Sequence, residues 1–161
     1  MDTNRIICYK FLFLLKGEIS LIPIKKAYGY VTRLREGKMQ LLVFQHSISE
    51  AGIQIPKGTI KNEEETHHAV IREIQEETGL EHFEVEQLIA EDYWKNNDGA
   101  IHHRFFYKIN ISDAPDEWNY QPTGGGEEEG LTFHFFWISS KDEVKLIRGH
   151  GDYLSIIFDE W

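Results

Sequence analysis

Cysteine is almost absent from this chain of 161 residues, and no segment is apolar for long enough to cross a membrane. The single cysteine, Cys8, excludes an intramolecular disulfide framework and a thiolate metal cluster, as is usual in a reducing cytoplasm. Within segment 5–17, the longest apolar run is Phe11 to Leu15, far short of the ~20 residues that a spanning helix needs. We therefore expect a cytoplasmic protein whose segment 5–17 is a buried or edge strand.

Positive charge is also scarce, because the net charge is −10. An acidic surface repels the nucleic-acid backbone, so we expect no duplex nucleic acid and no membrane as a partner. Any phosphate-bearing ligand needs local cations. Hydrophobic residues at 41% and charged residues at 27% are ordinary for a globular protein. The length predicts one domain over 1–161, with 1–25 as an N-terminal strand extension, and leaves a monomer or a homodimer open.

Strand patterns dominate both ends of the chain. The segments 27–34 and 39–46 flank the turn "REGK" and predict a hairpin. A second antiparallel pair is expected from 82–94 and 101–111, which flank the turn "NNDG". Between the strands lies one strongly helical segment. This arrangement predicts an α/β (α+β) layered domain with a mixed sheet.

The C-terminal third mixes loop, strand and helix patterns. Ser112 to Gly130 has Pro, Gly and acidic residues without periodicity, which predicts one long loop. The strand "LTFHFFWI" follows. Ser140 and Glu143 have the spacing of a capping box, so we expect a helix over 141–147. A last amphipathic helix is expected within 152–161.

The central helix is expected from Thr66 to Thr78. Val70, Ile71 and Ile74 form an apolar stripe at helical spacing, and Gly79 stands where a left-handed C-terminal cap belongs. One face of this helix is therefore expected to pack in the hydrophobic core.

The other face of the same helix carries Glu73, Glu76 and Glu77. Carboxylates at i, i+3 and i+4 project close together, and each like-charge pair costs about 0.2–0.5 kcal/mol of helix stability. Arg72 relieves only part of this repulsion. A solvated acidic face is the simplest interpretation of such a cluster. A hard divalent cation is the alternative, since Mg²⁺ binds carboxylate oxygens and bridges to phosphates.

The spacing favours the cation. Residues 58–80, "GTIKNEEETHHAVIREIQEETGL", satisfy G-x5-E-x7-R-E-U-x-E-E-x-G-U, where U is apolar. This pattern resembles the signature of the Nudix hydrolases and matches it without a substitution. The resemblance implies an α/β/α sandwich with a mixed central sheet. The fixed positions are Gly58, Glu64, Arg72, Glu73, Ile74, Glu76, Glu77, Gly79 and Leu80.

The resemblance also implies a reaction, the hydrolysis of a nucleoside diphosphate linked to another moiety, with Mg²⁺ or Mn²⁺ as cofactor. By position, Glu73, Glu76 and Glu77 would bind the metal, and Glu73 would be the best candidate to activate water. Arg72 would orient Glu73 through an ion pair. The chemistry agrees, because metal ions on carboxylates both activate water and neutralise phosphoryl charge.

Other positions of the motif would serve the backbone or the substrate. Glu64 would support the loop or lie behind the metal ligands. Gly58 is expected to form a turn into the loop, and Gly79 to cap the helix. Lys57, just before the motif, is either a phosphate contact or a solvated lysine.

Family members often add an acidic residue from a loop outside the motif. The candidates here are Glu127, Glu128 and Glu129, of which we favour Glu128; a merely solvated charged loop is the alternative. Glu91 and Asp92 are a second choice.

The substrate stays open. "IPKG" resembles the "PKG" of Nudix hydrolases that act on dinucleoside polyphosphates. A nucleoside triphosphate pyrophosphatase, an RNA 5'-pyrophosphohydrolase, a nucleotide-sugar hydrolase and a ligand-sensing module without catalysis are alternatives. The aromatic residues that either stack on a base or fill the core are Tyr93, Trp94, Tyr107 and Trp118.

Overall fold

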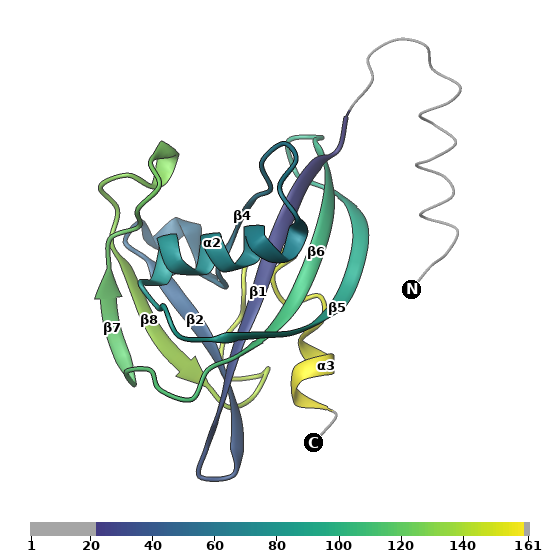
Figure 1. Cartoon of the computed structure of the whole chain (residues 1–161). Coiled ribbons are helices and arrows are strands. Elements are labelled where there is room, and N and C mark those ends of the chain that lie inside the picture. The colour runs from purple at the N-terminus through teal and green to yellow at the C-terminus, as the bar shows by residue number, and fades with distance from the viewer. Residues whose placement is uncertain (1–21, 160–161) are drawn as a thin grey trace.

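A computed structural model describes residues 22–159, which form a twisted mixed sheet with a helix on each face (Figure 1). The strands are β1 (Ile24–Arg35), β2 (Lys38–His46), β3 (Ile53–Gln54), β4 (Lys57–Thr59), β5 (Glu84–Lys95), β6 (Ile101–Asn110), β7 (Glu117–Tyr120) and β8 (Phe133–Ile138). The α-helices are α2 (Thr66–Thr78) and α3 (Leu154–Phe158), and the short 3₁₀ helices are η1 (Ser49–Ala51) and η2 (Gly126–Glu128).

The strand order is β5-β6-β1-β2-β8-β7, with β3 paired to β2 and β4 paired to β1. β1 and β6 are parallel, and the other pairs are antiparallel, so the sheet is mixed. The start of β1 pairs with β4 and its end pairs with β2. The short strand β4 therefore ends beside β1, directly ahead of the segment that leads into α2.

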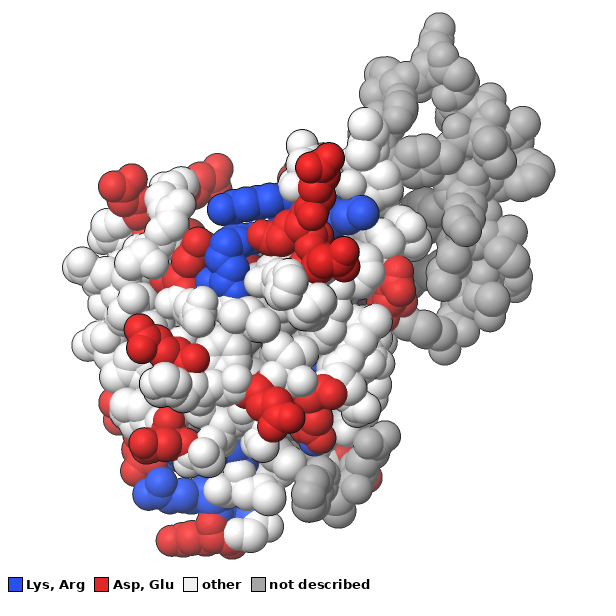
Figure 2. Space-filling model, viewed as in Figure 1, with Lys and Arg blue, Asp and Glu red and all other residues white. Residues whose placement is uncertain are grey.

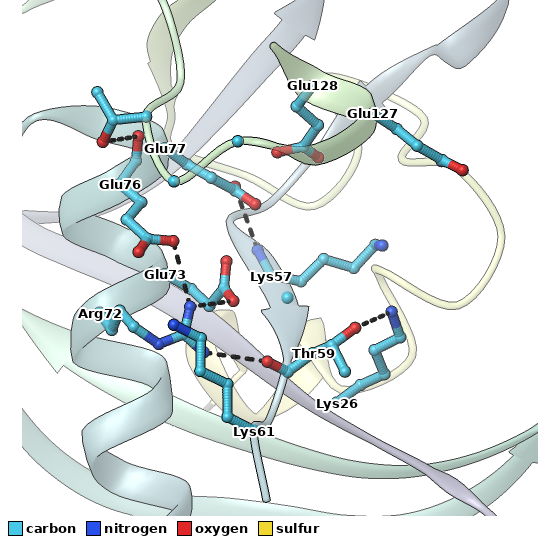
Figure 3. Close-up of a pocket in the computed structure, with 14 residues that line it drawn as sticks. Lys26, Lys57, Thr59, Lys61, Arg72, Glu73, Glu76, Glu77, Glu127 and Glu128 are labelled. Atoms are coloured by element: carbon cyan, nitrogen blue, oxygen red, sulfur yellow. Dashed lines mark hydrogen bonds and ion pairs between the residues drawn. The ribbon is translucent and has the colours of Figure 1, made fainter. Parts of the chain in front are cut away.

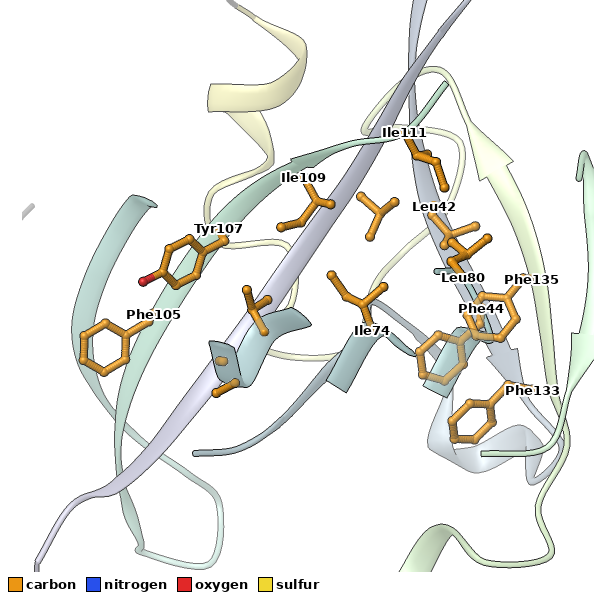
Figure 4. Close-up of a cluster of buried hydrophobic side chains, with 14 of the residues drawn as sticks. Leu42, Phe44, Ile74, Leu80, Phe105, Tyr107, Ile109, Ile111, Phe133 and Phe135 are labelled. Carbon is orange, nitrogen blue, oxygen red and sulfur yellow. The ribbon is translucent and has the colours of Figure 1, made fainter. Parts of the chain in front are cut away.

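Helix α2 covers one face of the sheet. Its buried side chains Ala69, Val70 and Ile74 pack against residues such as Ala27 and Val31 of β1. Figure 4 shows Ile74 among the side chains of this core. Because side chains alternate along a strand, every second residue of β1 faces this helix. The packing fixes α2 across the middle of the sheet and turns its glutamates toward β4.

The opposite face of the sheet has its own core. Tyr28 and Tyr30 of β1 point to this side and pack with Leu154 and Ile157 of α3. The two cores make three layers, helix, sheet and helix, which confirms the predicted fold class. No helix within 22–159 is both long and apolar enough to span a bilayer.

Several predicted elements are confirmed. The first hairpin is β1–β2, the second antiparallel pair is β5–β6, and the last helix is α3. Helix α2 begins and ends where the pattern predicts. The strand expected over 5–17 lies outside the described residues.

The helix expected over 141–147 does not form. Local capping contacts are present, since the Ser139 N–H donates to Glu143 Oε1 at 2.9 Å and the Asp142 N–H donates to Ser140 Oγ at 3.2 Å. The chain then turns toward β3, where the Ile147 N–H donates to the Ile53 carbonyl at 3.0 Å. This long-range bond, with the bridge between Ile53 and Leu146, replaces the next helical turn.

The prediction of one structureless loop from Ser112 to Gly130 is also wrong. It contains β7, which pairs with β8, and the single turn η2. Trp118 of β7 stacks on Phe135 at 4.9 Å and donates its Nε1–H to the Thr78 carbonyl at 3.0 Å. These contacts bring the second half of the segment, with its acidic residues, to the C-terminal end of α2.

Candidate active site

A cleft of about 420 Å³ lies between the glutamate face of α2, strand β4 and the η2 segment (Figure 3). Glu73, Glu76 and Glu77 line it from the helix, and Lys57 and Gly58 from β4. The sequence places these residues together because α2 follows β4 after a short loop. The structure thus brings the predicted helix and strand residues into one site. The remaining lining residues are Lys26, Thr59, Lys61, Arg72, Thr123, Gly124, Gly125, Glu127 and Glu128.

Arg72 connects the loop before α2 to the glutamates of the helix. Its Nε and Nη2 donate to the two carboxylate oxygens of Glu64 at 2.9 and 2.8 Å. Its Nη1 donates to Glu73 Oε1 at 2.6 Å and to Glu76 Oε2 at 3.2 Å. The Glu64 hydrogen bond is the main reason that the pKa of Arg72 rises and that of Glu64 falls. Glu64 does not line the cleft, and it holds the guanidinium that orients Glu73.

Glu77 is only 2% exposed, a burial that the sequence does not reveal. Its Oε2 accepts one long hydrogen bond, 3.3 Å, from the Lys57 backbone N–H. Burial raises the pKa of Glu77 well above its usual range, and the charges of Glu128 and Glu73 raise it further. A carboxylate without a paired cation at this depth is costly, so the site stores unfavourable free energy when no cation is present.

Burial also raises the pKa of Glu73, although Arg72 opposes the shift. The pKa of Glu128, which lies on η2, is also raised. Burial is the main cause, and the positive charge of Lys57 opposes it. Glu128 is half-buried, whereas its neighbours Glu127 and Glu129 are exposed. Of the three acids in this triplet, Glu127 and Glu128 line the cleft.

Gly58 has a different role from the predicted turn. It lies inside β4, pairs with Ala27 of β1, and has no positive φ. A Cβ atom on Gly58 would lie 1.9 Å from the carboxyl carbon of Glu73. Glycine is therefore required because the Glu73 side chain crosses directly over this backbone. Gly79 does cap α2, with φ 76° and its N–H on the Gln75 carbonyl, as predicted.

Three lysines line the cleft within an acidic protein. Lys57 was a candidate phosphate contact, with a solvated lysine as the alternative, whereas Lys26 of β1 and Lys61 were not predicted. Figure 2 shows acidic side chains in patches scattered among uncharged residues, and basic ones gathered mainly above α2 and around the β1–β2 hairpin. Lys61 occupies a variable position of the motif. Lys26 lies far from the motif in sequence, and only the β1–β4 pairing brings it into the cleft.

The η2 segment is attached to the helix through the backbone. The Thr123 N–H donates to the Glu76 carbonyl at 2.8 Å, and Gly124 lies against the Glu76 carboxylate. These contacts place Glu128 near the helix glutamates. No periodic pattern marks Thr123 in the sequence.

The second choice of loop acids lies elsewhere. Asp92 binds the buried Arg104 through two hydrogen bonds of 2.7 and 2.5 Å, and Glu91 pairs with His103 at 2.6 Å. Neither residue lines the cleft. The four aromatic candidates also lie outside it and pack on other side chains: Tyr93 on His103, Trp94 on Arg104, Tyr107 in the core below α2, and Trp118 on Phe135.

The donor atoms fit a hard divalent cation. Five carboxylates line one cleft, and oxygen donors suit Mg²⁺ and Mn²⁺; they are those of Glu73, Glu76, Glu77, Glu127 and Glu128. Within residues 22–159 no three acidic, histidine or cysteine side chains are already at metal-binding separation. Arg72 engages two of the glutamates instead. A cation would therefore bind with some rearrangement of these side chains.

Comparisons with known proteins agree with this architecture. The model of the NUDIX domain family matches residues 25–155. A search of curated proteins found no match. Among solved structures, an Ap4A hydrolase of C. elegans in a binary complex is 19% identical, with a TM-score of 0.56, and the match covers 72% of this chain and 80% of that one.

Two further structures align over more of the chain. The NUDIX domain of Shewanella oneidensis NrtR, complexed with ADP ribose, is 15% identical with a TM-score of 0.58, and the match covers 92% of this chain and 93% of that one. An ADP-ribose pyrophosphatase from Streptococcus suis is 20% identical with a TM-score of 0.56, and the match covers 85% of this chain and 87% of that one. At these identities the likeness concerns the fold.

Proposed function

Since the chain belongs to the Nudix hydrolase family, we propose that it is a pyrophosphohydrolase, dependent on Mg²⁺ or Mn²⁺, that cleaves a nucleoside diphosphate linked to another moiety. One observation carries the proposal. The glutamates of α2, with Glu128, face a cleft that is also lined by three lysines. This pairing of carboxylates with cations suits a metal ion together with an anionic diphosphate.

Glu73, Glu76 and Glu77 would hold the cation, with Glu128 as a further ligand or base. When bound, the cation supplies charge neutralisation on the phosphoryl oxygens and lowers the pKa of a water. Arg72 keeps Glu73 and Glu76 turned toward the cleft. The side chain of Lys57 binds a phosphate oxygen, while its backbone N–H fixes Glu77.

Proton removal from the attacking water needs a carboxylate whose pKa lies near the working pH. Glu73 and Glu128 both have raised pKa values because they are partly buried. Glu73 is the proposed base, because Arg72 holds its carboxylate in one orientation at 2.6 Å. Glu128 stands on a single turn and is the second candidate.

For the substrate, we propose a dinucleoside polyphosphate. The "IPKG" sequence, the lysines of the cleft and the fold shared with an Ap4A hydrolase support this choice. ADP-ribose, nucleoside triphosphates and RNA 5' ends are the alternatives within the same reaction class. A ligand-sensing module without catalysis is disfavoured, because all the fixed carboxylates of the motif are present and the three on α2, Glu73, Glu76 and Glu77, face the cleft.

The proposal also includes the setting in which the protein works. We propose a cytoplasmic enzyme that acts as a monomer or homodimer on a small nucleotide.

The test is hydrolysis of a substrate panel by the wild type and by Glu73→Gln. We expect wild-type release of mononucleotides that depends on Mg²⁺ or Mn²⁺, and a loss of about a hundredfold or more in kcat for the variant. Mass spectrometry of the products, run in ¹⁸O water, identifies the phosphorus atom that is attacked. The matched control is Glu81→Gln, an exposed glutamate just beyond α2 that lies outside the cleft. Equal turnover by wild type and Glu73→Gln would refute the assignment.

A further inference from the structure

We propose that Lys26 and Thr59 form a second anion subsite in the cleft, which takes a phosphate group beyond the diphosphate held at the glutamates. This inference rests on the proposed function and deepens it, because it makes the enzyme selective for substrates with three or more linked phosphates. Lys26 lies outside the motif, on the first strand of the sheet.

The subsite is built by the pairing of two strands. Lys26 of β1 and Thr59 of β4 are register partners, and the Lys26 Nζ donates to Thr59 Oγ1 at 2.7 Å. An ammonium group has three N–H donors, so two remain for a ligand. None of the ion pairs formed among residues 22–159 includes Lys26. Its charge is therefore half-buried without a carboxylate in contact.

The two most deeply buried arginines of the described residues are paired with carboxylates. The side chain of Arg104 is 1% exposed and contacts Asp92 and Asp152, and that of Arg33 is 6% exposed and contacts Asp116. Burying a cation costs free energy unless an anion compensates it. Lys26 and Lys57 are less buried than these arginines, take part in no ion pair within residues 22–159, and lie where the proposed function brings an anion.

The neighbourhood of Lys26 also favours an anion. Burial lowers the pKa of Lys26, and the like charge of Lys57 lowers it further, against weaker opposing effects of Glu73, Glu128 and Glu127. In Figure 3 the ends of Lys26 and Lys57 point to the same side of β4, away from Arg72 and Lys61. A phosphate between these two ammonium groups would relieve both their repulsion and the desolvation of Lys26.

The position of Lys26 and Lys57 in the cleft sets the number of linked phosphates that a ligand needs to reach them. The glutamates face the cleft from α2, whereas the ends of Lys26 and Lys57 lie together across β4 from Glu73 and Glu76 (Figure 3). A diphosphate held at the glutamates occupies the α2 side of the cleft. A phosphate bound between the two lysines therefore belongs to a longer chain of phosphates.

The experiment measures how Lys26→Gln binds inorganic triphosphate and pyrophosphate, by calorimetry with Mg²⁺ present. Losing a charge-assisted contact should weaken the binding of triphosphate about tenfold or more. The loss for pyrophosphate should be several times smaller. Lys26→Arg should restore the binding of triphosphate, and the control Lys25→Gln, an exposed neighbour outside this cleft, should leave both affinities unchanged. The same difference should appear in KM for dinucleoside polyphosphates compared with ADP-ribose.

Equal losses for the two probes, or no loss, would overturn the subsite. So would a fall in thermal stability of Lys26→Gln that Lys26→Arg does not reverse, because Lys26 would then only support the β1–β4 pairing. A failure of the proposed function would give a different result. The wild type would then hydrolyse no substrate of the panel, although Lys26→Gln would still weaken the binding of triphosphate.

Discussion

Replacing Glu77 with Gln should abolish catalysis and at the same time stabilise the metal-free protein. Glu77 is a proposed metal ligand, so we expect kcat to fall about a hundredfold or more. The same carboxylate is buried with one long hydrogen bond, and its neutral replacement should raise the free energy of unfolding by about 1–3 kcal/mol. Turnover with Mg²⁺ and urea unfolding in a chelator measure the two effects.

The stability gain has a definite pH dependence. Burial raises the folded-state pKa of Glu77 above the 4.5 of the unfolded chain. The native protein therefore retains a proton that the unfolded state has lost, and wild-type stability falls as the pH rises from about 4.5 up to the folded pKa. Gln does not titrate, so the variant does not lose stability in this way. Its gain in the free energy of unfolding over the wild type should be absent in acid and should grow toward neutral pH. Glu81→Gln is the control, and an advantage that shrinks as the pH rises would contradict the burial argument.

The second large effect is expected from Gly58→Ala. The added methyl group would lie 1.9 Å from the Glu73 carboxyl carbon, so either that side chain or strand β4 must move. Displacing a catalytic group by about 1 Å can cost about a hundredfold in rate, and we expect a loss of this size in kcat. Steady-state kinetics on the best substrate of the panel measures the loss.

Gly151→Ala is a matched control for this substitution. Its φ is not in the left-handed region, and an added Cβ would meet its nearest neighbour, a Leu154 methyl carbon, at an ordinary 3.5 Å. Near-wild-type activity is expected for this control. Near-wild-type activity of Gly58→Ala would show that the crossing of Glu73 over β4 does not matter for turnover.

The sequence predicts helix α2 and its glutamates well, because their determinants are local. Val70 and Ile74 belong to an apolar stripe at helical spacing, and Gly79 caps the helix at its C-terminal end. Neither signal depends on a partner that is distant in the sequence. The same spacing places Glu73 and Glu76 on one face. Arg72 pairs with Glu73, as the resemblance implies, whereas its pairing with Glu64, eight residues earlier, was not predicted.

Long-range contacts account for the misses. The helix expected over 141–147 gives way to a bond between Ile147 and Ile53, far apart in the chain. Lys26 enters the cleft through the register of β1 on β4, and the buried carboxylate of Glu77 contacts the backbone of β4 at Lys57. Periodicity carries no information about such pairings.

The central claim is that the glutamates of α2 bind a divalent cation that receives a diphosphate. Its most direct test is calorimetric titration of Mn²⁺ into the wild type and Glu77→Gln, without and with a slowly hydrolysed nucleotide. Saturable binding by the wild type, strengthened by the nucleotide and lost in Glu77→Gln, is the predicted result. No binding by the wild type even with nucleotide present, or equal binding by both proteins, would contradict the claim.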